Sequence, residues 1–160
     1  AIALAEEGAC TPGAAPIGCA IVMDGKIIAE AYNEVDVLCD PTAHAEVTAI
    51  RAACHDLGTF QLADCELYTS CEPCPMCMAN ALWAGLDRVV YGATIKDANK
   101  HCGQIQIPAK EVSRRSDMPC EVVGKVLRDE CYGLFTHPNM LKVFASWSSG
   151  DRKVSKKGKA

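Results

Sequence analysis

The sequence predicts an α/β fold, a three-layer α/β/α sandwich built on a mixed five-stranded sheet. Three observations lead to this fold class. Two apolar runs flank Asp24-Gly25 in "IGCAIVMDGKIIAEAYN" and indicate a β-hairpin. Three further short apolar runs alternate with segments of helical character, an order typical of a layered α/β domain. At 160 residues, the chain is long enough for one core and short for two domains.

The first half of the chain is expected to hold two helices around this hairpin. The opening stretch "AIALAEEGAC" resembles the middle of a helix, and we interpret it as a helix with a trimmed start. The hairpin occupies residues 17–33, and the polar residues 34–41 follow it as a loop. The next helix covers residues 42–58, because Thr42 is a capping residue, small helix formers follow it, and Gly58 ends the run.

The second half is expected to continue the alternation of strands and helices. The expected elements are a strand at 65–69, a helix at 74–85, a strand at 87–93, a loop with a short helix after Pro108, a strand at 120–124 and a helix at 125–136. Trp147 is expected to pack a terminal helix. The order of these elements places the five strands in one sheet between helices.

Charge is distributed unevenly along the chain. Residues 1–150 hold 11 Lys+Arg and 19 Asp+Glu, a net charge of about −8, whereas residues 151–160 hold five basic residues and one acidic residue. We expect residues 1–150 to form a single domain and residues 151–160 to be a basic, disordered tail. An acidic body argues against a large phosphate-binding surface, so binding to nucleic acid is not expected.

The apolar runs are too short for a membrane protein. None reaches the roughly 18 residues that a membrane-spanning helix needs, and the N-terminal stretch lacks the basic flank and cleavage pattern of a secretory signal. We therefore expect a cytoplasmic protein without a membrane partner.

The eleven cysteines fall into two groups. An odd number cannot pair completely, and a core of this size does not need disulfides, so the scattered cysteines are expected to be free thiols in a reducing cytosol, most of them buried. These are Cys10, Cys19, Cys39, Cys54, Cys65, Cys102, Cys120 and Cys131. The remaining three, Cys71, Cys74 and Cys77, form a cluster in "TSCEPCPMC".

This cluster and "PTAHAEV" together suggest a zinc site. Cys74 and Cys77 are three residues apart at a predicted helix start, so they lie on one face and can bind one ion. Helix N-termini favour the thiolate form, and Pro75 in the first turn loses no hydrogen bond there. His44, in the first turn of another predicted helix, supplies a third ligand. Three protein ligands and an open fourth position define a catalytic zinc, whereas four ligands define a structural one.

Glu46, two residues after His44, distinguishes the possible functions. Zinc lowers the pKa of a coordinated water towards about 7, and a nearby carboxylate can take that proton and pass it on. This chemistry predicts hydrolytic deamination of an electron-poor ring carbon. Two alternatives remain: a structural four-cysteine zinc module that also recruits Cys65 and Cys71, and a thiol–disulfide function of "CPMC" that leaves His44 and Glu46 without a role.

Over "DPTAHAEVTAIRAACHDLGTFQLADCELYTSCEPCPMC" the chain resembles the cytidine deaminase superfamily, and within it the guanine deaminases of bacterial type. The resemblance implies zinc as the cofactor and a homodimer in which partner segments complete the active site. Carried over position by position, it implies that His44, Cys74 and Cys77 bind zinc and that Glu46 shuttles protons. It further implies that substrate contacts come from Asn33, Ala45 and Trp83.

Two departures from the family pattern concern the substrate. Ile17 in "APIGCA" stands where the family carries an aromatic residue, and "DANKHCGQIQ" replaces a Gly-Phe-Asp-Asp segment that helps to hold the purine. His101 or Gln104 could take over that role, and His101 is the candidate substrate residue. Guanine, deaminated to xanthine and ammonia, is the expected substrate. The alternatives are a nucleoside such as guanosine, adenosine or cytidine, another heterocycle such as cytosine or an aminotriazine, and adenosine in tRNA.

Overall fold

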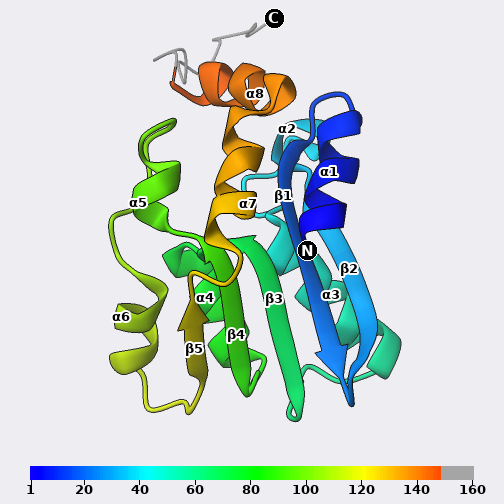
Figure 1. The fold of residues 1–160 in the computed structure, drawn as a ribbon. Coiled ribbons are helices and arrows are strands. Elements are labelled where there is room, and N and C mark those ends of the chain that lie inside the picture. Colours follow the sequence, from blue (N-terminus) through cyan, green and yellow to red (C-terminus); the bar gives the residue numbers. More distant parts are fainter. Residues whose placement is uncertain (149–160) are drawn as a thin grey trace, which may run out of the picture.

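The computed structural model describes residues 1–148 of the chain, and its core is a single sheet (Figure 1). The strands are β1 (Ala15–Met23), β2 (Lys26–Asn33), β3 (Cys65–Cys71), β4 (Arg88–Ala93) and β5 (Glu121–Gly124). They pair in the order β2-β1-β3-β4-β5. Strand β1 is antiparallel to both of its neighbours, whereas β3, β4 and β5 run parallel. The predicted mixed five-stranded sheet is confirmed.

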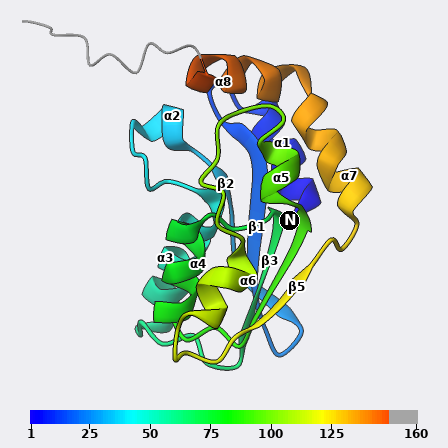
Figure 2. The ribbon, with the colours of Figure 1, turned by 90° about the vertical axis from the view of Figure 1, so that its left-hand side faces the viewer.

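Helices cover both faces of this sheet (Figure 2). They are α1 (Ile2–Cys10), α2 (Val35–Leu38), α3 (Ala45–Leu57), α4 (Pro75–Trp83), α5 (Ile95–Ala98), α6 (Ala109–Arg114), α7 (Arg128–Gly133), the 3₁₀ helix η1 (Leu134–Thr136) and α8 (Pro138–Ser148). Figure 2 shows α3 and α4 on one face of the sheet and α1 and α7 on the other. The predicted α/β/α layering is confirmed. Helix α8 lies at the end of the sheet where α2 and α5 also lie (Figure 1).

Local hydrogen bonds explain where the structure departs from the predicted boundaries. The helix expected at 42–58 begins at Ala45, because the Thr42 hydroxyl donates to the Asp40 carboxylate at 2.7 Å and does not cap the helix. His44 is the N-cap instead, and Gly58, in the left-handed conformation, ends the helix as predicted. The expected loop 34–41 contains the short α2, and the expected helix 125–136 divides into α7 and η1.

Most of the core lies between the sheet and the layer that contains α3 and α4. Ile21, Leu67 and Val89 project from three strands and are fully buried there with Met78 of α4. On the opposite face, α1 packs closely on β1 at Gly18. A Cβ at Gly18 would clash with the main-chain oxygen of Ala1, the N-cap of α1, so this close approach requires glycine.

A second apolar cluster joins α8 to the end of the sheet that carries α5. Its buried members include Ala93, Ala98, Phe135, Met140 and Phe144. This cluster attaches the C-terminal helix to the segment after β4. The predicted disordered tail, residues 151–160, lies outside the described residues.

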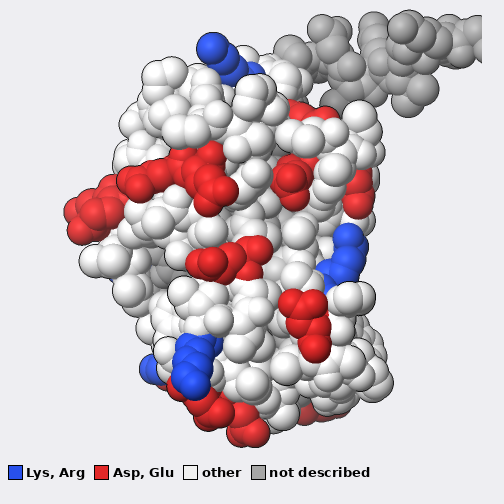
Figure 3. Space-filling view, turned by 90° about the vertical axis from the view of Figure 1, so that its right-hand side faces the viewer, with Lys and Arg blue, Asp and Glu red and all other residues white. Residues whose placement is uncertain are grey.

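The lengths of the helices and the charges on one face of the molecule concern two possible partners, a membrane and a nucleic acid. Among residues 1–148, no helix combines the length and apolar character that a membrane span requires. Figure 3 views the molecule from the side of α1, β2 and α3, and acidic side chains predominate over basic ones on this face. This face therefore lacks the basic surface that a bound nucleic acid backbone requires.

Candidate metal centre

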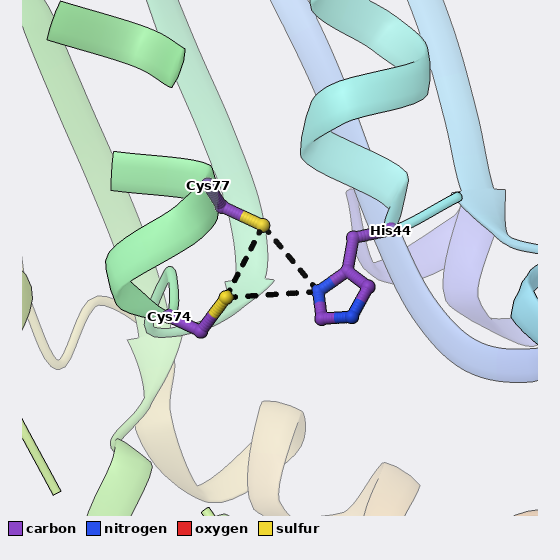
Figure 4. A group of neighbouring side chains, drawn as sticks. All are labelled: His44, Cys74 and Cys77. Carbon is purple, nitrogen blue, oxygen red and sulfur yellow. Dashed lines mark hydrogen bonds between the residues drawn. The ribbon is translucent and has the colours of Figure 1, made fainter. Parts of the chain in front are cut away.

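The three predicted metal ligands come from two helix starts that face each other (Figure 4). His44 is the N-cap of α3 and Cys74 the N-cap of α4, and both have extended backbone conformations. Pro75 occupies the first turn of α4, where its missing N–H costs no hydrogen bond, and Cys77 follows within the same turn. The two N-cap positions direct one imidazole and one sulfur towards the same point.

The separations of the ligand atoms fit a zinc ion. His44 Nδ1 lies 3.4 Å from Cys77 Sγ and 3.8 Å from Cys74 Sγ, and the two sulfurs are 3.6 Å apart. Tetrahedral zinc, with bonds of about 2.3 Å to sulfur and about 2.0–2.1 Å to nitrogen, places two sulfurs roughly 3.8 Å apart and sulfur and nitrogen roughly 3.6 Å apart. Within residues 1–148, these three side chains are the group suited to hold a metal. They can supply three ligands and leave the fourth position open.

The electrostatic environment favours one thiolate in this group. The hydrogen bond between Cys74 and Cys77 lowers the pKa of Cys74 to about 4, and burial opposes that shift. The same hydrogen bond, together with burial, raises the pKa of Cys77 well above its ordinary value. Burial alone would lower the pKa of His44, but its hydrogen bond to Cys74 and the charge of Glu46 raise it. A cation at this point would stabilise both thiolates.

Glu46 lies beside the three ligands without being one of them. Its side chain is 4% exposed, one carboxyl oxygen is 3.4 Å from Cys77 Sγ, and the other accepts a hydrogen bond from Thr69 Oγ1 at 3.4 Å. Burial raises the pKa of Glu46, and the nearby His44 partly offsets this. A carboxyl group in this environment is suited to take up and release a proton.

The structure contradicts the four-cysteine alternative. Cys65 and Cys71 lie at opposite ends of β3, and only Cys71 is close to the candidate site, where it borders the adjoining cavity. None of the eleven cysteines, all within the described residues, forms a disulfide. Fewer of the scattered cysteines are buried than expected, and two of them, Cys10 and Cys39, are exposed.

A cavity of about 50 Å³ adjoins the metal ligands. It is lined by Ile17, Asn33, His44, Glu46, Cys71, Glu72, Cys74, Ala98, Gln104, Phe144 and Trp147. This volume holds few water molecules, whereas small-molecule sites commonly measure about 300–1,000 Å³. A bound heterocycle therefore requires part of the wall to move outward.

The structure brings only some of the other predicted substrate residues to this cavity. Asn33 is 2% exposed, lines the cavity and accepts a hydrogen bond from the Val35 N–H at 3.3 Å. Ala45 is fully buried as the first residue of α3, between His44 and Glu46.

The two predicted aromatic contacts lie elsewhere. Trp83 is 70% exposed at the end of α4 and does not line the cavity. His101 lies in an aromatic cluster. Its ring packs among Tyr132, Phe135 and Phe144 with centroids 5.7–5.8 Å away, and it does not line the cavity either.

Sequence reasoning missed two aromatic residues in the cavity wall. The sequence assigns no role to Phe144 and predicts only that Trp147 packs a terminal helix. In the structure, both residues lie on α8 and line the cavity. Their spacing of three residues indicates a shared helix face. That pattern could not reveal that this face would meet the ends of β1 and β2.

With this geometry established, comparison with known proteins identifies the family. The family described as the cytidine and deoxycytidylate deaminase zinc-binding region matches residues 1–93. The chain belongs to this family, and the resemblance inferred from the sequence motifs is confirmed. The family's zinc-binding region also supports the assignment of zinc to the His44, Cys74 and Cys77 cluster.

The individual relatives are deaminases with different substrates in their names. The chain is 56% identical to guanine deaminase of Bacillus subtilis over 98 residues, which is 61% of this chain and 63% of that protein's length. It is 42% identical to a tRNA-specific adenosine deaminase of Aquifex aeolicus over 66% of this chain and 69% of that protein. A solved structure from work on A-to-I editing by tRNA:A34 deaminases superimposes with a TM-score of 0.72 at 31% identity, covering 84% of this chain and 94% of that one.

Proposed function

We propose that this chain is a zinc-dependent aminohydrolase that converts a free purine base, guanine in the first instance, to xanthine and ammonia. The observation that carries the proposal is the buried carboxyl group of Glu46 beside a three-ligand metal centre. A structural zinc has no need of such an acid, whereas hydrolysis requires a group that moves protons. The similarity to the Bacillus guanine deaminase supports guanine as the base.

The residues of the site have defined tasks in this reaction. His44, Cys74 and Cys77 would hold the zinc ion, which when bound would supply Lewis-acid activation of a water. Glu46 would take one proton from that water and pass it to the ring nitrogen. It would then take the proton of the hydroxyl group added to the ring carbon and pass it to the amino group, which leaves as ammonia as the carbonyl forms. In this proposal Asn33, which lines the cavity, hydrogen-bonds the base, and the cavity wall holds the ring in position. Ala45 is fully buried beside Glu46 and contacts the base only once the site opens.

The proposal also includes the oligomeric state and the cellular compartment of the enzyme. The exposed indole of Trp83 suits a homodimer in which each subunit completes its partner's site, and His101 would support the cavity wall from its aromatic cluster. We place the enzyme in the cytoplasm, acting on a small molecule in purine metabolism and not on nucleic acid. The acidic face in Figure 3 and the small cavity favour this choice.

Deamination of adenosine in tRNA is the second candidate. The similarity to tRNA adenosine deaminases supports it. Such an enzyme would have to hold an RNA backbone over a protein that has a net charge of −4.

An ammonia-release assay separates these candidates. The full chain, loaded with zinc, is tested with guanine, guanosine, adenine, adenosine, cytosine, cytidine, an aminotriazine and tRNA, and the Glu46→Gln variant serves as the blank. We expect turnover of guanine above all other substrates. Turnover of a nucleoside but not its base would reject the free-base assignment, and turnover of tRNA alone would establish the second candidate.

A further inference from the structure

Glu72 is a buried acid in residues 72–74, the loop between β3 and α4 that carries the candidate ligand Cys74 and is called the metal loop below. Glu72 also borders the cavity. It follows β3 directly and precedes the Pro73-Cys74 step, so its main chain belongs to the loop that carries a metal ligand. Its N–H donates to the Ala93 carbonyl at 2.7 Å, which extends the pairing of β3 with β4. The residue is only 7% exposed. A buried carboxyl group is costly unless hydrogen-bond donors satisfy its oxygens.

Two main-chain donors from distant positions satisfy this group. One carboxyl oxygen accepts from the Ile95 N–H at 2.9 Å, and the other accepts from the Ala109 N–H at 3.0 Å. Ile95 begins α5 and Ala109 begins α6. The first amides of a helix have no acceptor within the helix, so one side chain serves both helix starts. Glu72 thereby closes the segment from residue 95 to residue 109 onto the metal loop.

That segment forms one wall of the cavity. Ala98 and Gln104 line the cavity, and the main-chain N–H of Gln104 donates to the Asn99 side chain at 3.2 Å. The far side of α5 is fixed independently, because Asp97 forms a salt bridge with Arg128. Glu72 is thus the link between this wall and the loop that carries Cys74.

We propose that Glu72 is a positioning residue that fixes the wall formed by Ala98 and Gln104 against the metal loop, and so determines which heterocycle the cavity accepts. The inference rests on the proposed deaminase function and adds a determinant of substrate binding to it. Although Glu72 borders the cavity, both of its oxygens are engaged by main-chain donors, so it acts through the wall and not on the reacting atoms.

The test compares Glu72→Gln with Glu111→Gln. The first substitution keeps the shape of the side chain but replaces one acceptor oxygen with an amide group that faces a main-chain N–H. Glu111 is a matched control, because it is an acid on α6 that bonds Arg114 and Arg115 at the surface. The measurements are zinc content, kcat and KM for guanine or for whichever base the ammonia assay identifies, and hydrogen exchange at the Ile95 and Ala109 amides.

We expect Glu72→Gln to keep its zinc and to raise KM about tenfold with kcat within about threefold. Exchange at one or both amides should also be about tenfold faster, because a main-chain amide donates a stronger hydrogen bond to a carboxylate than to a neutral amide group. Glu72→Asp retains both oxygens and should recover part of the change in KM. The Glu111→Gln control should match the unsubstituted chain in all three measurements.

Other outcomes would overturn the assignment. Faster exchange with an unchanged KM would mean that the wall does not select the substrate, and loss of zinc would mean that Glu72 supports the metal loop. Failure of both Glu72→Gln and Glu72→Asp to fold would assign the residue to the fold alone. If the unsubstituted chain deaminates no compound, the proposed function fails, whereas zinc content and amide exchange still test whether Glu72 fixes the wall.

Discussion

The indole Nε1 of Trp147 donates to both carboxyl oxygens of Asp36, at 3.2 Å each, across 111 positions of the sequence. This contact fastens α8 to α2 beside the cavity that adjoins the metal ligands. The docking of the C-terminal helix therefore brings Phe144 and Trp147 into the cavity wall.

Removal of the Trp147 side chain should weaken substrate binding. Stacking of a base on an aromatic side chain is worth about 1–3 kcal/mol, so Trp147→Ala should raise KM about fivefold to 100-fold while zinc content stays constant. Trp147→Phe keeps a ring but loses the hydrogen bond to Asp36, and we expect a smaller increase in KM. Steady-state kinetics with guanine check this, and a KM for Trp147→Ala equal to that of the unsubstituted chain would contradict it.

Trp83 provides a test of the proposed dimer. If its exposed indole completes the partner's site, Trp83→Ala lowers activity without loss of zinc. An equal mixture of the Trp83→Ala and Glu46→Gln chains, after exchange of subunits, should then regain roughly a quarter of full activity, because half of the dimers are mixed and each has one intact site. Activity no higher than the average of the separate variants would show that each subunit works alone.

Substitution of Glu46 should separate chemistry from metal binding. We expect Glu46→Gln to bind zinc as well as the unsubstituted chain does and to lose about 10²–10⁴-fold in kcat, the usual contribution of a general acid–base. Metal analysis and ammonia release measure the two properties on the same sample. Glu6→Gln, at an exposed position of α1, is the control. Undiminished turnover in Glu46→Gln would remove the carboxyl group from the mechanism.

The metal should also stabilise the fold, because its ligands join the starts of α3 and α4. A ligand present at 100 times its dissociation constant stabilises the native state by about 2.7 kcal/mol. Zinc should therefore raise the thermal midpoint of the unsubstituted chain but not that of Cys74→Ala. Cys10→Ala removes an exposed cysteine and should respond to zinc normally. An equal response in Cys74→Ala would place the metal elsewhere.

The ion pair of Asp97 with Arg128 should make stability depend on pH. Burial alone would raise the pKa of the Asp97 carboxyl, but hydrogen bonds from Arg128 and Thr94 outweigh it and hold the pKa well below its ordinary value. A lowered pKa in the folded state stabilises the protein above the unfolded value of about 3.9, and the effect is lost as pH falls below it.

The free energy of unfolding should therefore fall by about 2 kcal/mol in Asp97→Asn near pH 7. This difference from the unsubstituted chain should shrink steadily below about pH 4, because the carboxyl group of the unfolded chain takes up a proton there while the native carboxyl stays ionised down to its lowered pKa. Denaturant unfolding across this range measures it, with the exposed Asp117→Asn as the control. A difference that does not vary with pH would contradict the role of the ionised pair.

The sequence alone was sufficient for the layer order, the sheet and the metal ligands. The pattern of apolar runs and the turn at Asp24-Gly25 act over a few residues, as does the spacing of Cys74 and Cys77 at a helix start. Such short-range signals can be recognised without knowing what the element contacts. The N-cap of α3 was predicted wrongly, because Thr42 had a competing partner in Asp40, a choice that composition does not reveal.

The walls of the cavity depended on tertiary structure. Glu72 meets Ile95 and Ala109, and Trp147 meets Asp36, only because the segment after β4 and the C-terminal helix return to the same end of the sheet. His101, the candidate substrate residue, lies in an aromatic cluster away from the cavity for the same reason. Contacts between distant segments are set by how whole elements pack, and no local pattern records them. The sequence itself therefore determined which chemical groups gather at this site, and the packing of its last third decided the shape of the cavity beside them.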